Sequence, residues 1–438
     1  MKKISIENFR GFRNFEMNFT PGVTLLVGNN ASGKTSLLKA VKFALSSFFS
    51  GFSDDNTRWQ SPSNEDFRRV IREDWSAPIQ PILIGFSLRN DMFGEANLCE
   101  IGDKELFVRK NSPKNSRNLI SGLIPLRNLG QFLSRNMYDK ENGESIRRYP
   151  LPLFDSISTV YTHVDKKVNK NRFLSLAPQP SLGYLECLTG GGLAAHWWKR
   201  ISVLAETNKR TWEIEGVQNA IERALGPNGC NIIKGIRPIV SLNEIFIDTI
   251  DGNTTTYDLL PDGYRRLIDI VINLAFRSLL LNGELYGKDA PLHTKGVVLI
   301  DEIDLHLHPS LQATVIQGLR SAFPNIQFIL TTHAPRVMSG LENSADNQVV
   351  LMRKEGENGD VTAIKFHTFG LDVNSILSLL GLSIRDNKTQ KELEELFQLI
   401  DDGEEEKARE MIADLRKRFG EYLPDITEAE TLLNISSI

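Results

Sequence analysis

Cysteine is scarce in this chain of 438 residues, which contains three, at Cys99, Cys187 and Cys230. Their number is odd, they lie far apart, and no pair has the short spacing of metal-ligating cysteines. The sequence therefore supports neither a disulfide framework nor a zinc knuckle. Such sparse thiols fit a reducing compartment.

Long hydrophobic runs are also missing. Residues 1–10 alternate polar and apolar side chains and lack the apolar core of a signal peptide. No window approaches the roughly 20 apolar residues that a membrane-spanning helix needs. We therefore expect a cytoplasmic protein without a membrane segment.

A strong excess of charge of either sign is likewise lacking. The formal net charge is -4, and contents of 41% hydrophobic and 24% charged residues are ordinary for soluble globular proteins. Overall charge would not steer this chain to nucleic acid, so a DNA contact requires a local basic patch. Residues 109–117 and 166–172 are basic candidates, although solvated loops are the favoured interpretation of both.

The most distinctive stretch covers residues 296–309, an apolar run that stops at two adjacent carboxylates. Residues 297–300 are apolar at every position, which is typical of a parallel strand covered by helices on both faces. Asp301 and Glu302 follow directly. Because functional sites of such sheets lie at the carboxyl ends of the strands, these two acids are candidate site residues.

A phosphate-binding loop lies near the amino terminus. Residues 23–27 form a strand pattern and lead into an eight-residue match to G-x-x-x-x-G-K-[ST] that ends at Lys34 and Thr35. Its glycines let backbone N–H groups turn toward a phosphate, and the next helix points its positive end there. Lys34 would reach the terminal phosphates of ATP, and Thr35 would bind Mg²⁺. The expected nucleotide contacts are Asn29, Asn30, Ala31, Ser32, Gly33, Lys34, Thr35 and Ser36.

Two further segments belong to the expected site. Residues 259–263 open a very apolar helix over residues 265–281, so a second helix amino terminus is presented. Residues 327–330 form another buried strand pattern, which runs into Thr331, Thr332 and His333. We expect this strand to neighbour the strand that ends at Asp301.

The remaining pattern predicts the secondary structure in outline. We expect a hairpin over residues 3–19, a short helix over 66–72, strands over 82–88, 104–108 and 232–250, a long helical stretch over 193–225 and one helix over 310–322. Trp197 and Trp198 are expected to pack in the core. From residue 371 the chain is strongly charged with helical periodicity, which predicts a small helical hairpin.

These parts together resemble the ATPases of the ABC type over nearly the whole chain. Residues 6–12, Ile-Glu-Asn-Phe-Arg-Gly-Phe, resemble the first strand of RecF, SMC and OLD-like heads. Residues 301–309 and 331–335 look like the stand-alone ATPases of bacterial defence systems. Residues 369–374 and the acidic tail are similar to the PtuA-like ATPases of Septu systems and related retron effectors.

The resemblance implies an α/β fold, namely an ABC-type P-loop ATPase head with a mixed β-sheet. It would have an amino-terminal antiparallel β lobe, an inserted helical segment and a carboxyl-terminal helical tail. The implied boundaries place an amino-terminal ATPase lobe at residues 1–165, a helical insertion at 166–228, a carboxyl-terminal ATPase lobe at 229–370, and a tail for assembly or partner binding at 371–438.

The resemblance also implies roles for the site residues, with ATP and Mg²⁺ as cofactors. Asp301 would hold Mg²⁺ through water, and Glu302 would polarise the attacking water. His333 would sense the γ-phosphate and, with Glu302 and Lys34, make up the catalytic set. Asp262 and Gly263 would contact the nucleotide of another subunit.

The implied partners follow from the same family. We expect a homodimer through the ATPase heads or a larger homo-oligomer, contact with DNA, and a separate HNH endonuclease of the PtuB-like kind. No membrane partner is expected.

One residue departs from the family pattern. The family usually has Ser before the Asp-Gly of the signature, where its hydroxyl would contact the opposite γ-phosphate, and this chain has Pro261. We therefore expect slow turnover, with ATP acting mainly as a structural or sensory ligand.

Two alternatives stay open. An OLD-like ATPase acting on DNA is the first, although the segment after His333 is too short and too helical for the nuclease domain of OLD nucleases, so we expect no nuclease activity in this chain. A RecF- or SMC-like DNA repair ATPase without an HNH partner is the second. His306 and His308 beside Asp304 could also suggest a metal site, but a subunit contact is favoured there.

Overall fold

The computed structural model describes residues 1–68, 79–96, 101, 104–113, 121–141, 144–159, 171–189, 193–239, 244–355, 360–382, 386–420 and 423–436. The chain divides into two compact units, Met1–Gly370 and Leu371–Ile438. Within the described ranges, no helix combines the length and the apolar character needed to cross a membrane.

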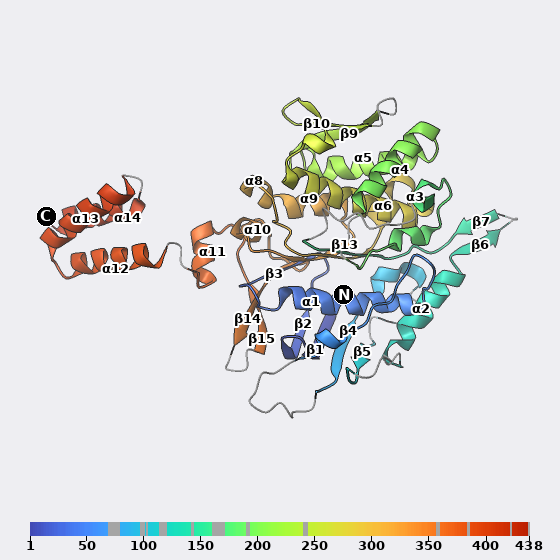
Figure 1. The fold of residues 1–438 in the computed structure, drawn as a ribbon, viewed down its shortest axis with the longest axis horizontal. Helices are drawn as coiled ribbons and strands as arrows, with labels where there is room; N and C mark the ends of the chain where they lie inside the picture. The colour runs from blue at the N-terminus through green and yellow to red at the C-terminus, as the bar shows by residue number, and fades with distance from the viewer. Residues whose placement is uncertain are drawn as a thin grey trace. The chain divides into compact units, whose positions relative to one another are not determined.

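A six-stranded mixed sheet forms the centre of the first unit, in the order β15-β14-β3-β13-β12-β8 (Figure 1). Its strands are β3 (Val23–Val27), β8 (Leu153–Ile157), β12 (Gly296–Ile300), β13 (Ile326–Thr331), β14 (Asn347–Glu355) and β15 (Asp360–Phe366). All neighbouring pairs are parallel except β14 and β15. Every residue of β3, β12 and β13 is buried, which explains why these strands are apolar apart from Thr24, Gln327 and Thr331.

Helices cover both faces of this sheet. Helix α1 (Lys34–Ser46) lies on one side, whereas α5 (Thr211–Leu225), α6 (Asp262–Tyr286) and α9 (Val315–Ala322) lie on the other (Figure 1). Helix α6 is 25 residues long, and most of its residues are buried. The sheet order puts β13 between β3 and β12, so the phosphate-loop strand and the acidic strand end at the same edge.

A second, antiparallel sheet forms the amino-terminal lobe, in the order β2-β1-β4-β5. It contains β1 (Lys3–Phe9), β2 (Phe12–Asn18), β4 (Ile82–Ser87) and β5 (Leu106–Lys110). The predicted antiparallel lobe and mixed sheet are thus confirmed. Of the short helix predicted at residues 66–72, the structure shows a 3₁₀ turn at Asn64–Asp66, and residues 69–72 lie outside the described part.

The remaining elements of the first unit are short or peripheral. A three-stranded sheet contains β9 (Ile233–Ile239), β10 (Glu244–Thr249) and β11 (Thr254–Thr256), and a small hairpin contains β6 (Tyr138–Glu141) and β7 (Glu144–Arg147). The further helices are α2 (Ile124–Arg135), α3 (Asn171–Leu174), α4 (Ala194–Thr207), α7 (Ala290–His293), α8 (Pro309–Gln312) and α10 (Pro335–Ser339).

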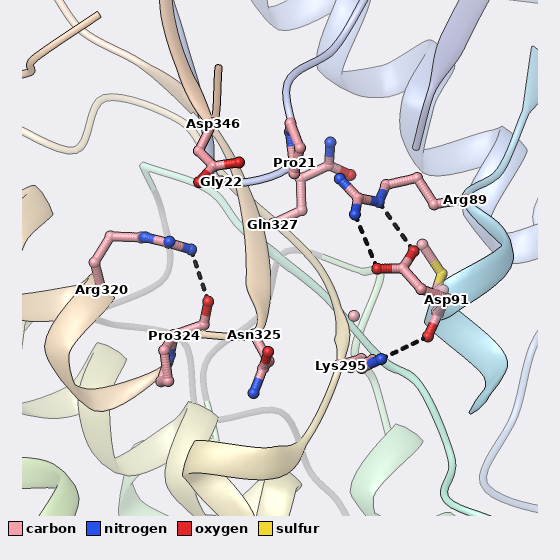
Figure 2. A pocket seen from close by; sticks show the side chains of 12 residues that line it. Pro21, Gly22, Arg89, Asp91, Lys295, Arg320, Pro324, Asn325, Gln327 and Asp346 are labelled. Carbon is pink, nitrogen blue, oxygen red and sulfur yellow. Dashed lines mark hydrogen bonds and ion pairs between the residues drawn. The ribbon is translucent and has the colours of Figure 1, made fainter. Parts of the chain in front are cut away.

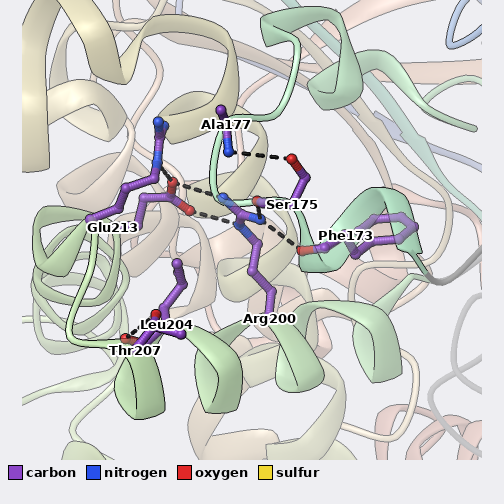
Figure 3. A network of polar contacts seen from close by, with 8 residues as sticks. Phe173, Ser175, Ala177, Arg200, Leu204, Thr207 and Glu213 are labelled. Carbon is purple, nitrogen blue, oxygen red and sulfur yellow. Dashed lines mark hydrogen bonds and ion pairs between the residues drawn. The ribbon is translucent and has the colours of Figure 1, made fainter.

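The helical stretch predicted over residues 193–225 consists of two helices, α4 and α5. Asn208 and Arg210 between them have φ values of 49° and 50°, which a right-handed helix does not allow. A buried guanidinium ties the two helices together: Arg200 donates to both oxygens of Glu213, at 2.7 and 2.9 Å (Figure 3). The predicted packing role of Trp197 is confirmed, since it is fully buried and stacks on Phe276.

The single helix predicted over residues 310–322 is also divided, into α8 and α9. The Thr314 N–H bonds to the carbonyl oxygen of Leu311 at 3.1 Å, a tight turn that ends the regular α-helical pattern. Of the two basic segments, residues 114–117 and 166–170 lie outside the described part of the structure.

The second unit has helices as its regular secondary structure over the described residues. It contains α11 (Val373–Leu379), α12 (Asn387–Asp401), α13 (Glu405–Phe419) and α14 (Pro424–Ser436). The last three helices share a hydrophobic core of Leu393, Leu396, Ala408, Ile412, Leu415, Ile426, Ala429 and Leu433. The predicted hairpin corresponds to α12 and α13, whose apolar faces α14 also covers, and α11 precedes them.

Candidate nucleotide-binding and hydrolysis site

The phosphate loop follows β3 and has the backbone that its glycines were expected to provide. Gly28 and Gly33 have φ values of 143° and 100°, and Ala31 has 63°. A Cβ atom at Gly28 would lie 2.3 Å from the carbonyl oxygen of Met352, so no larger residue fits there. Helix α1 begins at Lys34 and directs its amino terminus toward the loop.

Lys34 is buried and turned back onto its own loop. Its Nζ donates to the carbonyl oxygens of Gly28 at 2.7 Å and Asn29 at 3.0 Å. Burial lowers the pKa of this ammonium, while the carboxylates of Asp301 and Glu302 act in the opposite direction. Because burial makes the charged form of Lys34 unfavourable, a negatively charged ligand in contact with it would stabilise that form.

The rest of the loop is open to a ligand. Asn29, Asn30, Ala31 and Thr35 are exposed, and Gly33 and Ser36 are half-buried. Ser32 is buried, and its hydroxyl oxygen has no hydrogen-bond partner among the described residues. An unpaired buried hydroxyl inside a glycine-bounded loop fits a phosphate cradle.

Asp301 is the residue that joins the strand ends. The Thr35 hydroxyl donates to its carboxylate at 3.1 Å, and the Thr331 hydroxyl donates to its other oxygen at 2.6 Å. The parallel register explains the meeting, since Ile300 pairs with Leu330 and Thr331 pairs with Leu26 of β3. The structure therefore brings the predicted Mg²⁺ ligands Thr35 and Asp301 together.

Glu302 is half-buried and has an unusual backbone conformation. Its φ is 52°, in the left-handed region that non-glycine residues seldom adopt. Its N–H donates to the Thr331 hydroxyl oxygen at 2.7 Å. Backbone strain of this kind costs on the order of 1–3 kcal/mol and persists where surrounding contacts impose it.

The predicted histidine lies beside a third acid. The Thr332 hydroxyl donates to the Asp304 carboxylate at 2.6 Å, and the N–H of His333 approaches the same oxygen at 3.4 Å. The His333 side chain is exposed. Asp304 thus connects the loop after β12 to the end of β13 within one chain.

The start of α6 lies against the same loop. Pro261 precedes the helix with φ of -56°. Asp262 is exposed and forms an ion pair with Arg265, whereas Gly263 is buried. A Cβ at Gly263 would lie 2.3 Å from the carbonyl oxygen of His306, so the glycine permits close contact between helix and loop.

Three site residues were missed by the sequence analysis, namely Thr331, Thr332 and Arg266. The guanidinium of Arg266 donates to the carbonyl oxygens of Asp301 at 3.2 Å and Glu302 at 2.8 Å. The two threonines were visible as hydroxyls at a buried strand end. Nothing in the pattern distinguished Arg266 from its half-buried neighbour Arg265.

The histidines near the acidic strand have separate surroundings. The His308 ring caps α8, with Nδ1 2.9 Å from the hydroxyl of Ser310, and His306 is exposed with φ of 63°. Among the described residues, no group of three or more His, Cys, Asp or Glu side chains has the arrangement of a metal site. These findings give the transition-metal interpretation no support.

A different cleft lies at the opposite, amino ends of β12 and β13 (Figure 2). Its basic side chains have partners within the cleft: Arg89 donates to the Asp91 carboxylate at 2.8 and 3.0 Å, Lys295 donates to the Asp91 carbonyl at 3.0 Å, and Arg320 donates to the Pro324 carbonyl at 2.8 Å. None of the predicted nucleotide contacts lines it. The candidate site is therefore the carboxyl edge of the sheet.

The donor set at that edge fits ATP and Mg²⁺. The buried ammonium of Lys34 and the unpaired Ser32 hydroxyl suit phosphate oxygens. Thr35 and Asp301 offer the hard oxygen ligands that Mg²⁺ prefers. Glu302 lies next to them with a carboxylate suited to a general base.

Two family models match the chain. One is described as an AAA domain and covers residues 3–223, and the other is described as an AAA domain, putative AbiEii toxin, Type IV TA system, and covers residues 117–339. Each spans about half of the sequence.

Two curated relatives resemble the chain over most of its length, and a third resembles less than half of it. The retron Vc95 probable ATPase of Vibrio cholerae serotype O1 biovar El Tor is 24% identical, over 87% of this chain and 79% of the relative. The retron Ec83 probable ATPase of Escherichia coli is 25% identical, over 81% and 71%. The Septu protein PtuA of Bacillus mycoides (strain KBAB4) is 30% identical, over 42% of this chain and 26% of the relative.

Solved structures match with low identity. The SMC head domain from Thermotoga maritima is 15% identical with a TM-score of 0.40, covering 84% of this chain and 98% of that chain. The recombination mediator protein RecF is 13% identical with a TM-score of 0.39, covering 83% and 97%.

Proposed function

Since this chain belongs to the AAA-domain family of ATPases, we propose that it binds ATP with Mg²⁺ and regulates a separate nuclease in a defence complex. Relatives named retron ATPase and Septu protein PtuA confirm the resemblance to PtuA-like ATPases, and ATPase activity follows from the family. The nuclease partner, the defence complex and the individual residue roles are the proposal.

One observation carries the nucleotide part of the proposal. The Thr35 hydroxyl from the phosphate loop and the Asp301 carboxylate from β12 meet at 3.1 Å, although 266 positions separate them in the sequence. Two Mg²⁺ ligands that meet beside a phosphate loop are the arrangement that P-loop ATPases use. When bound there, Mg²⁺ neutralises charge on the phosphate oxygens.

The other residues take distinct roles around this centre. Lys34 leaves the carbonyl oxygens of Gly28 and Asn29 and binds the terminal phosphates. Glu302 orients the attacking water and accepts its proton, for which a general base contributes about 10²- to 10⁴-fold in rate. His333 is exposed at the end of β13 and senses the γ-phosphate.

Asp262 and Gly263 contact the nucleotide bound to a second copy of the chain. The exposure of the Asp262 side chain at the amino terminus of α6 supports this role for Asp262, whereas Gly263 is buried against the loop after β12 and brings the helix close to that loop. The proposal therefore includes a homodimer through the ATPase heads, or a larger homo-oligomer built from it.

The nuclease is a separate HNH chain, and this chain does not cut DNA itself. After His333 the described residues supply one antiparallel strand pair and helices, and the second unit is helical. Incubation of the purified protein with DNA and Mg²⁺ or Mn²⁺ should leave the DNA intact. Degradation would support the OLD-like alternative.

A RecF- or SMC-like ATPase that acts on DNA without a nuclease is the second candidate function, supported by matches to RecF over 18–27% of the chain. The neighbouring gene and co-purification decide between the two. An adjacent HNH gene whose product co-purifies with this chain supports the defence complex, whereas a replication or repair operon supports the alternative.

ATP hydrolysis is tested by phosphate release from the wild type, Glu302→Gln and Lys34→Met. Glu302→Gln should lose at least 100-fold in rate and keep the stabilisation of the fold by ATP. Lys34→Met should lose both the rate and the stabilisation by ATP. A Glu302→Gln variant with wild-type turnover would contradict the assigned role.

A further inference from the structure

Arg266 is a buried cation that the proposed roles do not use. It lies in the second turn of α6 and is 1% exposed. One of its nitrogens donates to the carbonyl oxygens of Asp301 and Glu302. Its Nε and remaining terminal nitrogen are buried without a hydrogen-bond partner among the described residues.

The charge of Arg266 is balanced at longer range by the site acids. Burial lowers the pKa of the guanidinium, and the carboxylates of Asp304, Glu302 and Asp301 oppose this in decreasing order. The buried Arg277 on the same helix is held differently, because it forms an ion pair with Asp155 at 3.3 Å. Arg266 thus has two guanidinium nitrogens without a hydrogen-bond partner among the described residues, in an acidic site, whereas Arg277 has one such nitrogen and its Nε is paired with Asp155.

The peptide of Glu302 is held from both sides. Its N–H donates to the Thr331 hydroxyl oxygen, and its carbonyl oxygen accepts a hydrogen bond from Arg266 at 2.8 Å. These two hydrogen bonds flank the residue with φ of 52°. Loss of either one would let the backbone relax toward an ordinary conformation and move the carboxylate.

Arg266 also sits where helix and loop cannot move independently. Gly263, one turn earlier on α6, packs so closely on the carbonyl of His306 that a Cβ there would lie 2.3 Å away. A displacement of the α6 amino terminus would therefore be carried to the loop that follows β12. Arg266 supplies the hydrogen bonds by which that displacement reaches the acidic residues.

We propose that Arg266 is a positioning residue that couples the amino terminus of α6 to the Asp301 and Glu302 backbone, and thereby sets Mg²⁺ affinity and turnover rather than ATP affinity. This inference rests on the proposed ATP site. In the proposed site, Arg266 acts through Asp301 and Glu302 and not by direct contact with the nucleotide or the attacking water. Supporting residues of this kind typically change metal affinity or activity by about 10- to 100-fold.

The test compares Arg266→Gln with Arg277→Gln in the full-length chain. Arg277 is a matched control because it is also an arginine of α6 and is fully buried, yet it lies three turns away against Asp155. Each variant is measured for kcat, KM for ATP, melting temperature, and the Mg²⁺ concentration that gives half of the thermal stabilisation by ATP.

Arg266→Gln should lower kcat by about 10-fold or more, raise the Mg²⁺ midpoint by about 10-fold, and leave KM for ATP within about threefold. Arg277→Gln should lower the melting temperature without moving the Mg²⁺ midpoint. Arg266→Lys, which keeps the charge, should recover part of kcat and of the Mg²⁺ midpoint, and it replaces the glutamine variant if that one does not fold.

A wild-type kcat and Mg²⁺ midpoint in folded Arg266→Gln, or in Arg266→Lys if only that variant folds, would overturn the proposal. Equal changes of kcat and of the Mg²⁺ midpoint in both glutamine variants, together with lowered melting temperatures, would mean that Arg266 has only a structural role. That result would also overturn the proposal. If the wild type bound ATP with Mg²⁺ and did not hydrolyse it, the hydrolysis proposal would fail, and the Mg²⁺ midpoints would still decide the role of Arg266.

Discussion

The Thr331 hydroxyl donates a hydrogen bond to the Asp301 carboxylate at 2.6 Å. Its oxygen also accepts the N–H of Glu302 at 2.7 Å. A single side chain at the end of β13 therefore orients one acid through its carboxylate and the next through its backbone. Thr331 is fully buried, so water does not replace it in either contact.

Thr331→Val keeps the shape of the side chain and removes both hydrogen bonds. We expect turnover to fall by about 10-fold or more, because Asp301 and Glu302 lose a common support. The unpaired N–H of Glu302 should also cost about 1–3 kcal/mol of unfolding free energy. Phosphate release and urea unfolding measure the two effects.

Thr294→Val is the matched control. Thr294 is fully buried just before β12, at the other end of the strand, and its hydroxyl oxygen accepts from Asn282 at 3.0 Å. This variant should lose stability and keep turnover. Equal losses of turnover in both variants would mean that the Thr331 effect is only one of folding.

Pro261→Ser should raise the hydrolysis rate. The serine restores the hydroxyl that the family presents to the opposite γ-phosphate, and serine is also a favourable residue before a helix. We expect a gain of about 10-fold in kcat over a slow wild type. Leu259→Ser, which puts a hydroxyl on an exposed residue of the same turn, should give no gain. An already rapid wild-type rate that depends on Glu302 would contradict the slow-turnover hypothesis.

Asp269 should make stability depend on pH. It is 3% exposed on α6 and accepts the Tyr257 hydroxyl at 2.7 Å, and burial raises its pKa from 3.8 to about 7. The folded state therefore binds this proton more tightly than the unfolded state does. The contribution of Asp269 to the unfolding free energy is highest below pH 4 and is lost as the pH rises to about 7.

Asp269→Asn removes this titration. The variant minus wild-type difference in unfolding free energy should increase between pH 4 and pH 7, by up to a few kcal/mol, and should level off above that range. Urea unfolding at several pH values measures it. Asp258→Asn, at an exposed carboxylate beside Tyr257, should give a flat difference. A flat difference for Asp269→Asn as well would contradict the prediction.

Leu396→Ala should destabilise the second unit selectively. Leu396 is fully buried in the core of α12, α13 and α14, and removal of such a side chain costs about 2–5 kcal/mol. Leu432 on α14 is 41% exposed, so Leu432→Ala should cost much less. Thermal unfolding of Leu396→Ala should show a separate transition at a lower temperature. At temperatures below that transition, the variant should retain ATP hydrolysis by the first unit. Lost hydrolysis in the folded variant would contradict this separation.

The chain's local pattern was sufficient to predict the phosphate loop, the acidic strand end and the strand bearing His333. Glycines at fixed spacing and unbroken apolar runs reflect constraints that act within about ten residues, namely backbone conformation and burial on both faces of a strand. The same reasoning predicted the antiparallel amino-terminal lobe. It also predicted that Asp301 and His333 end neighbouring strands.

The contacts between distant segments were decided by the tertiary structure. Residues 193–225 were predicted as a helical stretch without a stated break. The structure shows two helices separated by the left-handed residues Asn208 and Arg210 and joined by the buried pair of Arg200 and Glu213. The tail gained a third helix because two amphipathic helices left a common apolar face uncovered.

Arg266 shows the same limit at the site itself. It and Arg265 are adjacent and chemically identical, but one is buried against the Asp301 and Glu302 carbonyls and the other forms a partly exposed ion pair with Asp262. Only the packing of α6 on the sheet separates them. The sequence by itself supplied the residues that we propose to bind phosphate and metal. The sheet order and the close contact at Gly263 decided which side chains hold those residues in place, because such contacts join segments that are far apart in the chain.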